Sequence, residues 1–400
     1  MSILLDSAAM SSSLGLNDNG DQSKAIFFNP SLLQKQTNLP KQFIWPNAQT
    51  STNHLHEELN EPLVDLEGFF KGDEEATAQA VQLIRTACSR HGFFQVTNHG
   101  VDGGLIREAQ DALAAFFELP IDEKLRVRRK KGTELSGYSG AHADRFGSEL
   151  PWKETFSFGY RFESCRNSGG KPAVVDYFRS VLGQDFEHAG QVYQKYAEAM
   201  KELSLTIFQL LGISLGVGPS EYSKFFEDGG SLTRYNYYPP CKQASLTFGT
   251  GPHSDPPALT ILHQDQVGGL QVFSDDKWLT IPPRRDALVI NIGDTFMALS
   301  NGIYKSCIHR AVVNEKRERR TLAFFVNPRE DKVVRAPEGL VDREGGGGGG
   351  CGGGGGGGRK YPDFKWFDLL EFTQFHYRAD SATFQSFCQW LSSSKPTHDF

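Results

Sequence analysis

The chain has 400 residues and a formal net charge of −6. No basic face or tail is evident, which argues against nucleic acid as a main partner. No segment reaches the roughly 20 apolar residues that span a bilayer, so we expect no membrane association. Its six cysteines show no C-x-x-C spacing, which predicts reduced thiols in a cytoplasmic protein and no zinc or disulfide framework.

The first 55 residues are rich in Ser, Asn, Asp and Gln, and their few apolar residues are not clustered. Such a segment buries too little apolar surface to offset the loss of chain entropy on folding. We therefore predict that residues 1–55 are disordered. No basic region or long apolar run opens the chain, so a secretory signal is not expected.

A mixed region of helices and strands is predicted over residues 60–215. A strand starts at 62–66, apolar residues at helical spacing predict a helix over 74–90 ended by Gly92, and a buried strand and turn follow at 93–101. A second helix is predicted at about 104–117. Between 185 and 212 a single apolar stripe predicts a core-facing helix that backs a sheet, with the residues Val192, Tyr196, Met200, Leu203, Ile207 and Leu210.

From residue 231 the pattern changes to alternation, which is typical of strands. Short alternating runs separated by Gly, Pro and Asp indicate a sandwich or barrel, and they lie at 232–238, 258–263, 269–273, 278–281, 287–292, 303–313 and 321–326. We predict a mainly β fold with flanking helices, whose core over residues 225–340 is a double-stranded β-helix of the jelly-roll kind.

Residues 345–358 are all Gly except Cys351, which predicts a flexible insertion without a chemical role. A C-terminal helical extension is predicted over 360–392. Its apolar residues are expected to cover the core, namely Phe367, Leu370, Phe384, Phe387 and Trp390.

The strongest chemical signal is His253-Ser254-Asp255, followed much later by His309. On a strand, residues i and i+2 share a face, so His253 and Asp255 are expected to grip one ion. Two imidazoles and one carboxylate form the facial triad of non-haem Fe(II) oxygenases, whereas a zinc site of the cupin kind would favour a third His. His263-Gln264-Asp265 is a rival motif, but no second His follows it at the matching place.

Ten residues after His309, Arg319 begins an alternating run and Thr321 follows on the same face. An arginine can bind a carboxylate through two parallel hydrogen bonds, so these residues predict a site for a small dicarboxylate beside the metal. The competing interpretation is a solvated turn, because residues 315–320 are mostly charged.

Together with the segment from Asn236 to Cys241, NYYPPC, these motifs resemble the plant 2-oxoglutarate and Fe(II)-dependent dioxygenases. The segment LPWKET at 150–155, taken with NYYPPC, resembles the gibberellin 20-oxidases within that family. The resemblance covers roughly residues 60–340 and 359–392. The family usually has Ser where this chain has Thr321, which keeps the hydroxyl and adds a methyl group.

The resemblance implies Fe(II) bound by His253, Asp255 and His309, and 2-oxoglutarate bound by Arg319, Thr321, Tyr238 and Asn236, with ascorbate as reductant. The catalytic set is then His253, Asp255, His309 and Arg319. The implied reaction uses dioxygen to oxidise carbon 20 of a diterpenoid acid in successive steps until that carbon is lost. Lys153 and Arg145 are the candidates for the substrate carboxylate.

Two alternatives stay open at this point. A related dioxygenase could act on another gibberellin position or on a flavonoid, and a catalytically silent homologue could serve as a binding protein. The complete triad and Arg319 weigh against the silent homologue, since a binding module has no need of an open metal site. The oligomeric state is not indicated by the sequence.

Overall fold

A computed structural model describes residues 28–46, 48, 57–130, 135–142, 149–162, 173–341, 358–376 and 382–394. The glycine tract predicted as a flexible insertion lies outside these residues except for Gly358, and so do residues 1–27, 47 and 49–55 of the predicted disordered segment. Among the described helices, none combines the length and the apolar character needed to cross a membrane.

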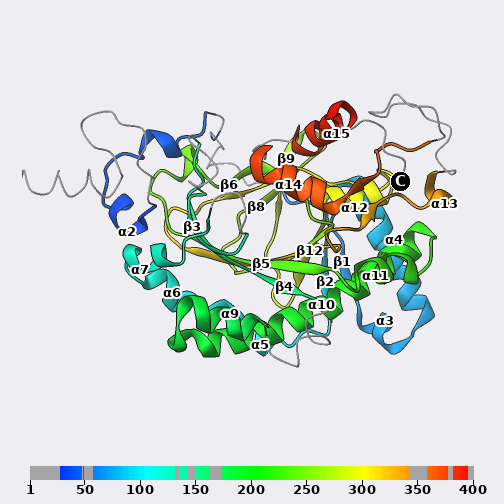
Figure 1. Ribbon diagram of the computed structural model, residues 1–400, viewed down its shortest axis with the longest axis horizontal. Coiled ribbons are helices and arrows are strands. Elements are labelled where there is room, and N and C mark those ends of the chain that lie inside the picture. The colour runs from blue at the N-terminus through cyan, green and yellow to red at the C-terminus, as the bar shows by residue number, and fades with distance from the viewer. Residues whose placement is uncertain are drawn as a thin grey trace, which may run out of the picture.

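Two sheets form the centre of the molecule, and in Figure 1 the smaller sheet lies above the larger one. The four-stranded sheet has the order β6 (Phe248–His253), β11 (His309–Val312), β8 (Leu270–Ser274) and β9 (Lys277–Ile281). The eight-stranded sheet has the order β1 (Leu63–Asp65), β2 (Phe93–Thr97), β10 (Leu288–Ile292), β7 (Leu259–Gln264), β12 (Arg319–Asn327), β5 (Gly230–Tyr238), β4 (Glu154–Arg161) and β3 (Gly137–Gly140). Apart from the parallel pair β1 and β2, the paired strands are antiparallel. This is the predicted mainly β architecture with a jelly-roll core.

Helices flank the sheets (Figure 1). The helix α4 (Glu74–Arg90) has the predicted bounds, and Gly92 follows it with a φ of +70°, a conformation that glycine adopts without strain. The helix predicted at 104–117 is instead two helices, α5 (Gly103–Ala112) and α6 (Ala114–Glu118), interrupted at Leu113. The remaining helices are α2 (Pro30–Leu33), α3 (Glu67–Lys71), α7 (Ile121–Arg126), α9 (Ala173–Leu182), α10 (Glu187–Leu215), α11 (Ser220–Phe226), α12 (Asp294–Leu299), α13 (Glu338–Val341), α14 (Trp366–His376) and α15 (Ala382–Ser394).

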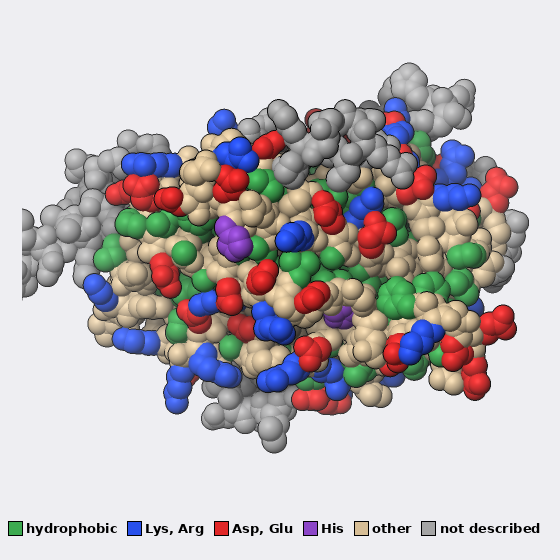
Figure 2. Space-filling model, turned by 90° about the horizontal axis from the view of Figure 1, so that it is seen from below, with side chains coloured by type: hydrophobic (Ala, Val, Ile, Leu, Met, Phe, Trp, Pro, Cys, Tyr) green, Lys and Arg blue, Asp and Glu red, His purple; other side chains and the backbone are tan. Residues whose placement is uncertain are grey.

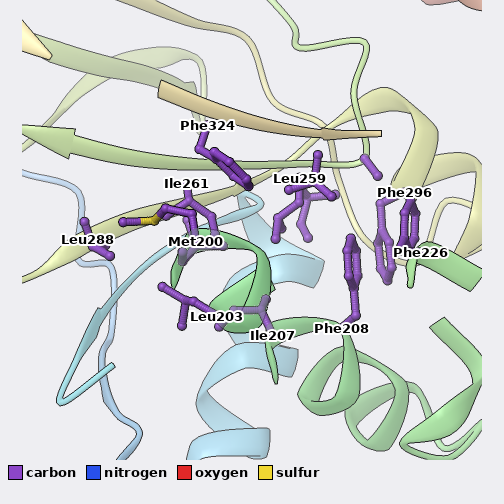
Figure 3. Close-up of a cluster of buried hydrophobic side chains, with 14 of the residues drawn as sticks. Met200, Leu203, Ile207, Phe208, Phe226, Leu259, Ile261, Leu288, Phe296 and Phe324 are labelled. Carbon is purple, nitrogen blue, oxygen red and sulfur yellow. The ribbon is translucent and has the colours of Figure 1, made fainter. Parts of the chain in front are cut away.

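The long helix α10 backs the large sheet, as its apolar stripe predicted. All six residues of the stripe are buried. Figure 3 shows Met200, Leu203 and Ile207 of this helix directed toward Ile261 and Leu259 on β7 and Phe324 on β12. Burial of this continuous apolar surface is the main force that holds the helix on the sheet.

The prediction of disorder is wrong for residues 28–46, which contain α2 and a 3₁₀-helix at Lys41–Phe43. Their aromatic side chains supply the missing apolar surface, because Phe28 and Phe43 pack edge-on against Trp152, with ring centroids 5.2 and 5.4 Å away. The partner comes from the LPWKET segment, more than a hundred residues later. A local composition count could not detect this long-range cluster.

Two predictions for the C-terminal half need correction. The strand expected at 303–313 begins only at His309, because Tyr304 is buried beside α10 and the backbone N–H of Lys305 donates to Cys88 at the end of α4. The expected C-terminal helix is two helices, α14 and α15. Phe367 is 48% exposed and therefore does not cover the core, whereas Phe384 and Phe387 are buried.

A short two-stranded sheet, β13 (Val333–Val334) with β14 (Phe364–Lys365), connects the segment after β12 to the start of α14. On the face seen in Figure 2, which is the underside of Figure 1, acidic and basic side chains are interspersed and hydrophobic side chains form small separate groups. Neither sign of charge dominates this face.

Candidate active site

Three potential metal ligands meet between the two sheets. His253 ends β6 and His309 begins β11, and these two residues are register partners in adjacent strands. Nε2 of His253 lies 3.4 Å from Oδ1 of Asp255, and Nε2 of His309 lies 3.6 Å from Oδ2 of Asp255. Asp255 is not on the strand, as the i, i+2 argument assumed, but in the loop just beyond it. The loop still brings its carboxylate to both imidazoles.

Hydrogen bonds orient all three side chains. Nδ1 of His253 lies 2.9 Å from the carbonyl oxygen of Gly251, and Nδ1 of His309 lies 3.3 Å from that of Cys307. A carbonyl oxygen can only accept, so each imidazole carries its proton on Nδ1 and presents the lone pair of Nε2 to the centre of the site.

The carboxylate of Asp255 is held from the large sheet. Its Oδ2 accepts a hydrogen bond of 2.7 Å from the Thr260 hydroxyl and one of 3.0 Å from the Asn291 amide. Thr260 lies on β7 and Asn291 on β10. The two sheets therefore fix the relative position of the three ligands.

The protonation states suit a divalent metal. Burial lowers the pKa of His309 to about 4, so its imidazole is neutral at pH 7. Burial alone would raise the pKa of Asp255, but the nearby His309 and His253 and a hydrogen bond from Asn291 hold this pKa well below its usual range. One carboxylate and two imidazoles, whose ligand atoms all lie within 4.8 Å of one another, match the donor set of a non-haem Fe(II) site.

One face of the large sheet forms the floor of a pocket beside this cluster. On β12 the alternate residues Arg319, Thr321, Ala323 and Phe325 line it, and on β5 so do Leu232, Arg234, Asn236 and Tyr238. The strand register places Arg319 opposite Tyr238 and Thr321 opposite Asn236. The predicted alternation of Arg319 and Thr321 into the site is thus present, and within the charged run 315–320 the exposed part is the bend at 315–317.

Arg319 is a buried cation, with 2% of its surface exposed. Its guanidinium donates to Oε1 of Gln264 at 3.2 Å and lies over the Tyr238 ring, while its Nε has no hydrogen-bond partner among the described residues. A buried guanidinium with an unsatisfied donor is costly unless an anion binds it. These residues therefore fit a carboxylate ligand in the pocket.

The predicted polar residues around Arg319 form a connected network. The Asn236 amide donates to the Thr321 hydroxyl at 3.1 Å, and the Tyr238 and Thr250 hydroxyls lie 3.3 Å apart. Nζ of Lys153 donates to Thr250 at 2.9 Å and to Oδ1 of Asn236 at 3.3 Å. Lys153 therefore lines the pocket from within the network that surrounds Arg319.

Two other candidates are placed differently. Nδ1 of His263 lies 2.7 Å from Nε2 of Gln110 on α5, and neither His263 nor Asp265 lines the pocket, so the rival pair His263 and Asp265 is not part of the metal cluster. Arg145 lies outside the described residues.

Several pocket residues were missed by sequence reasoning. Arg234 precedes Asn236 by two positions on β5, so the alternation alone could have indicated it. Thr260 and Asn291 carry no motif, and their role depends on strand pairing. The residues of α14 that line the pocket have no sequence signal of this kind either, namely Trp366, Leu370, Thr373 and Gln374.

Comparisons with known proteins agree with this site. A family model described as the 2OG-Fe(II) oxygenase superfamily matches residues 229–328, and one described as non-haem dioxygenase in morphine synthesis N-terminal matches residues 62–174. Gibberellin 20 oxidase 2 of Oryza sativa subsp. japonica is 52% identical over 90% of this chain and 87% of its own length. Gibberellin 20 oxidase 1 of Arabidopsis thaliana is 50% identical over 93% of this chain and 94% of its own length.

A solved structure described as JOX2 in complex with 2OG, Fe and JA aligns with a TM-score of 0.74 at 29% identity, covering 90% of this chain and 98% of that one. The structure of a dioxygenase for auxin oxidation from rice aligns with a TM-score of 0.60, also at 29% identity, over 78% of this chain and 94% of that chain. Relatives at about half identity cover nine tenths or more of this chain, and the site has the two imidazoles and one carboxylate of a non-haem Fe(II) centre. The chain belongs to the 2OG-Fe(II) oxygenase superfamily.

Proposed function

We propose that this enzyme is a gibberellin 20-oxidase, which oxidises carbon 20 of C20 gibberellins in successive steps and removes it to give C19 gibberellins. The observation that carries the proposal is the intact triad of His253, Asp255 and His309 beside the buried Arg319, in a chain about 50% identical to gibberellin 20 oxidases over nine tenths of its length. The enzyme is an Fe(II)- and 2-oxoglutarate-dependent dioxygenase, and its substrates are a small diterpenoid acid and dioxygen.

We assign the three ligand atoms of the triad to Fe(II), which together with 2-oxoglutarate supplies the activation of dioxygen. Thr260 and Asn291 hold the Asp255 carboxylate, and the carbonyls of Gly251 and Cys307 hold the two imidazoles. Ligands fixed in this way bind the ion without first reorganising.

The far carboxylate of 2-oxoglutarate is assigned to the guanidinium of Arg319 and the hydroxyl of Thr321, with Tyr238 beside them. A guanidinium presents two parallel N–H donors to such a carboxylate. Asn236 has a positioning role, because its amide group joins Thr321 to Lys153. Burial of these residues keeps water away from the reacting groups.

The pocket also offers room and an apolar wall for a hydrocarbon skeleton. Trp45, Leu232 and Phe325 line it together with residues of α14. An apolar pocket with a few convergent polar groups is the usual form of a site for a small, largely hydrophobic ligand. We further propose that the enzyme acts in the cytoplasm, which agrees with the unpaired thiols of Cys88, Cys241 and Cys307.

The test is an anaerobic reconstitution with Fe(II), 2-oxoglutarate and ascorbate, followed by air and a C20 gibberellin precursor. Succinate and gibberellin products are quantified together. Succinate matched to oxidised C20 and C19 products is the expected result. Oxidation at another gibberellin position, or of a flavonoid alone, would reassign the substrate, and the absence of turnover by protein shown to hold Fe(II) and 2-oxoglutarate would overturn the assignment as an enzyme.

A further inference from the structure

One basic residue of the pocket is used neither by the metal cluster nor by the Arg319 network. Arg234 lies on β5 and shares its inward face with Asn236 and Tyr238. Those two residues are opposite Thr321 and Arg319, whereas Arg234 is opposite Ala323. Arg234 therefore lies two positions from Asn236 on the same face of β5, next to the residues assigned to 2-oxoglutarate.

The side chain of Arg234 is held in place on two sides. Its Nε donates to the Ser157 hydroxyl of β4 at 3.1 Å, and its guanidinium carbon lies 5.3 Å from the centre of the Phe325 ring. Between these supports, Ala323 contributes only a methyl group to the floor of the pocket. Arg234 is half-buried and lines the pocket together with Phe325, so a ligand in the pocket can reach its side chain.

The charges around the pocket favour a second anion in addition to 2-oxoglutarate. Among the described residues that line it, four are basic, namely Lys153, Arg234, Arg310 and Arg319, and Asp255 is the single carboxylate. Arg310 is buried against Trp278, with its guanidinium carbon 3.9 Å from the ring centre, and it donates to Gln271. Arg310 is buried, whereas Arg234 is half-buried.

Lys153, the residue expected from sequence to meet the substrate carboxylate, is less well placed for that role. It is only 4% exposed, and its Nζ is engaged by Thr250 and Asn236. Burial, with the charges of Arg234 and Arg129, holds the pKa of Lys153 well below its usual range. A buried amine of this kind is a weaker partner for a carboxylate than a half-exposed guanidinium.

We propose that Arg234 binds a carboxylate of the diterpenoid acid and thereby determines the orientation of the substrate over the metal site. The inference rests on the proposed function and extends it to the residue that recognises the acid. Ser157 fixes one edge of the guanidinium and Phe325 supports its face, so a carboxylate can be received without ordering a flexible side chain.

The experiment measures binding by calorimetry to the full chain loaded with Mn(II) and 2-oxoglutarate under nitrogen. The ligands are a C20 gibberellin precursor as the free acid and as its methyl ester. The wild type should bind the acid about ten- to a hundredfold more tightly than the ester, the range expected for hydrogen bonds to a charged group. Arg234→Gln should bind the acid as weakly as the ester, with affinity for the ester unchanged, and Arg234→Lys should recover part of the difference.

Three controls make the result specific. The affinity for 2-oxoglutarate should stay within about twofold of wild type in Arg234→Gln, which also shows that the variant is folded. Arg161→Gln removes an arginine from an exposed position of β4 and should behave as wild type. Lys153→Met tests the competing assignment.

Preference for the acid that persists in Arg234→Gln would overturn the inference, and so would loss of that preference in Lys153→Met alone. Both results would leave the proposed function standing, because each can be observed only if the wild type binds the gibberellin precursor. A wild type that binds Mn(II) and 2-oxoglutarate but neither form of the precursor would overturn the proposed function, and the inference with it.

Discussion

The guanidinium of Arg319 lies over the ring of Tyr238, with its central carbon 5.1 Å from the ring centre, and the two residues are register partners on β12 and β5. The pair places a buried cation on an aromatic face at one end of the pocket. A cation in this position is attracted by the ring, but its charge is not neutralised. The arrangement therefore favours binding of an anion.

Replacement of Arg319 by Met should raise the KM for 2-oxoglutarate strongly. Truncation of one partner in a buried, hydrogen-bonded charge pair costs about 2–5 kcal/mol, which corresponds to a loss of affinity between about thirtyfold and several thousandfold. Arg319→Lys should recover only part of this loss, because an ammonium group cannot donate two parallel hydrogen bonds. Succinate release at increasing 2-oxoglutarate measures the effect.

The free energy of unfolding is the control measurement for Arg319→Met. A buried cation without a carboxylate partner does not stabilise the ligand-free protein, so Arg319→Met should not lower its free energy of unfolding in urea. A variant with an unchanged KM for 2-oxoglutarate would show that the carboxylate binds elsewhere.

Removal of one imidazole from the triad should abolish both metal binding and turnover. His309→Ala leaves a two-ligand site, so calorimetry with Mn(II) should detect no specific binding and succinate should not form above background. In the wild type, Mn(II) at about a hundred times its Kd should stabilise the fold by about 2.7 kcal/mol, and the variant should not respond.

His263→Asn is the matched control for the metal site. His263 contacts Gln110 of α5 and does not line the pocket, so Mn(II) binding and turnover should be retained. Equal losses in both variants would mean that the first effect arises from general damage to the fold.

Much of this site could be predicted because many of its residues lie on strands, where alternate side chains point to the same face. Arg319 and Thr321 were expected to share a face, and the alternation of β12 places both in the pocket. The apolar stripe of α10 likewise predicted its burial against the sheet. In both cases residue spacing is sufficient, because local backbone geometry sets the direction in which each side chain points.

Other features depend on contacts that spacing does not contain. Asp255 reaches the two imidazoles from a loop after the strand, where the i, i+2 rule does not apply. The segment that contains Phe28 and Phe43 is ordered because both side chains pack against Trp152. The segment before His309 is held by Cys88 instead of continuing the strand. Each of these results is decided by a partner distant in sequence.

Stability should fall as the pH decreases below about 6.5. Burial lowers the pKa of His91 and of His263 to about 4, so each stays neutral in the folded protein while the unfolded chain takes up a proton. Between pH 6.5 and 4 the unfolded state therefore binds more protons, and the free energy of unfolding declines as pH falls. The loss between pH 7 and 5 should reach up to about 2 kcal/mol per histidine.

Urea unfolding of the metal-free protein at pH 7 and pH 5 measures this decline. His263→Asn should show a smaller decline than wild type, and His188→Asn, at an exposed position of α10, controls for the loss of an imidazole. A decline equal to that of wild type in His263→Asn would assign the pH effect to other groups.

Substitution of Gly249 by Ala should weaken 2-oxoglutarate binding by displacing the ring of Tyr238. A Cβ at Gly249 on β6 would lie 2.5 Å from Cδ1 of Tyr238 and 3.2 Å from Cγ1 of Val313, so the buried tyrosine ring must move. Overpacking of this kind typically costs about 1–3 kcal/mol. Because Arg319 lies on the same ring, we expect the KM for 2-oxoglutarate to rise about tenfold, by the conversion of 1.4 kcal/mol to a factor of ten.

Gly159→Ala on β4 is the control, since its Cβ would meet only the carbonyl oxygen of Ser231 at 3.8 Å. Reduced stability of Gly249→Ala with an unchanged KM would show that the position of the Tyr238 ring does not govern co-substrate binding.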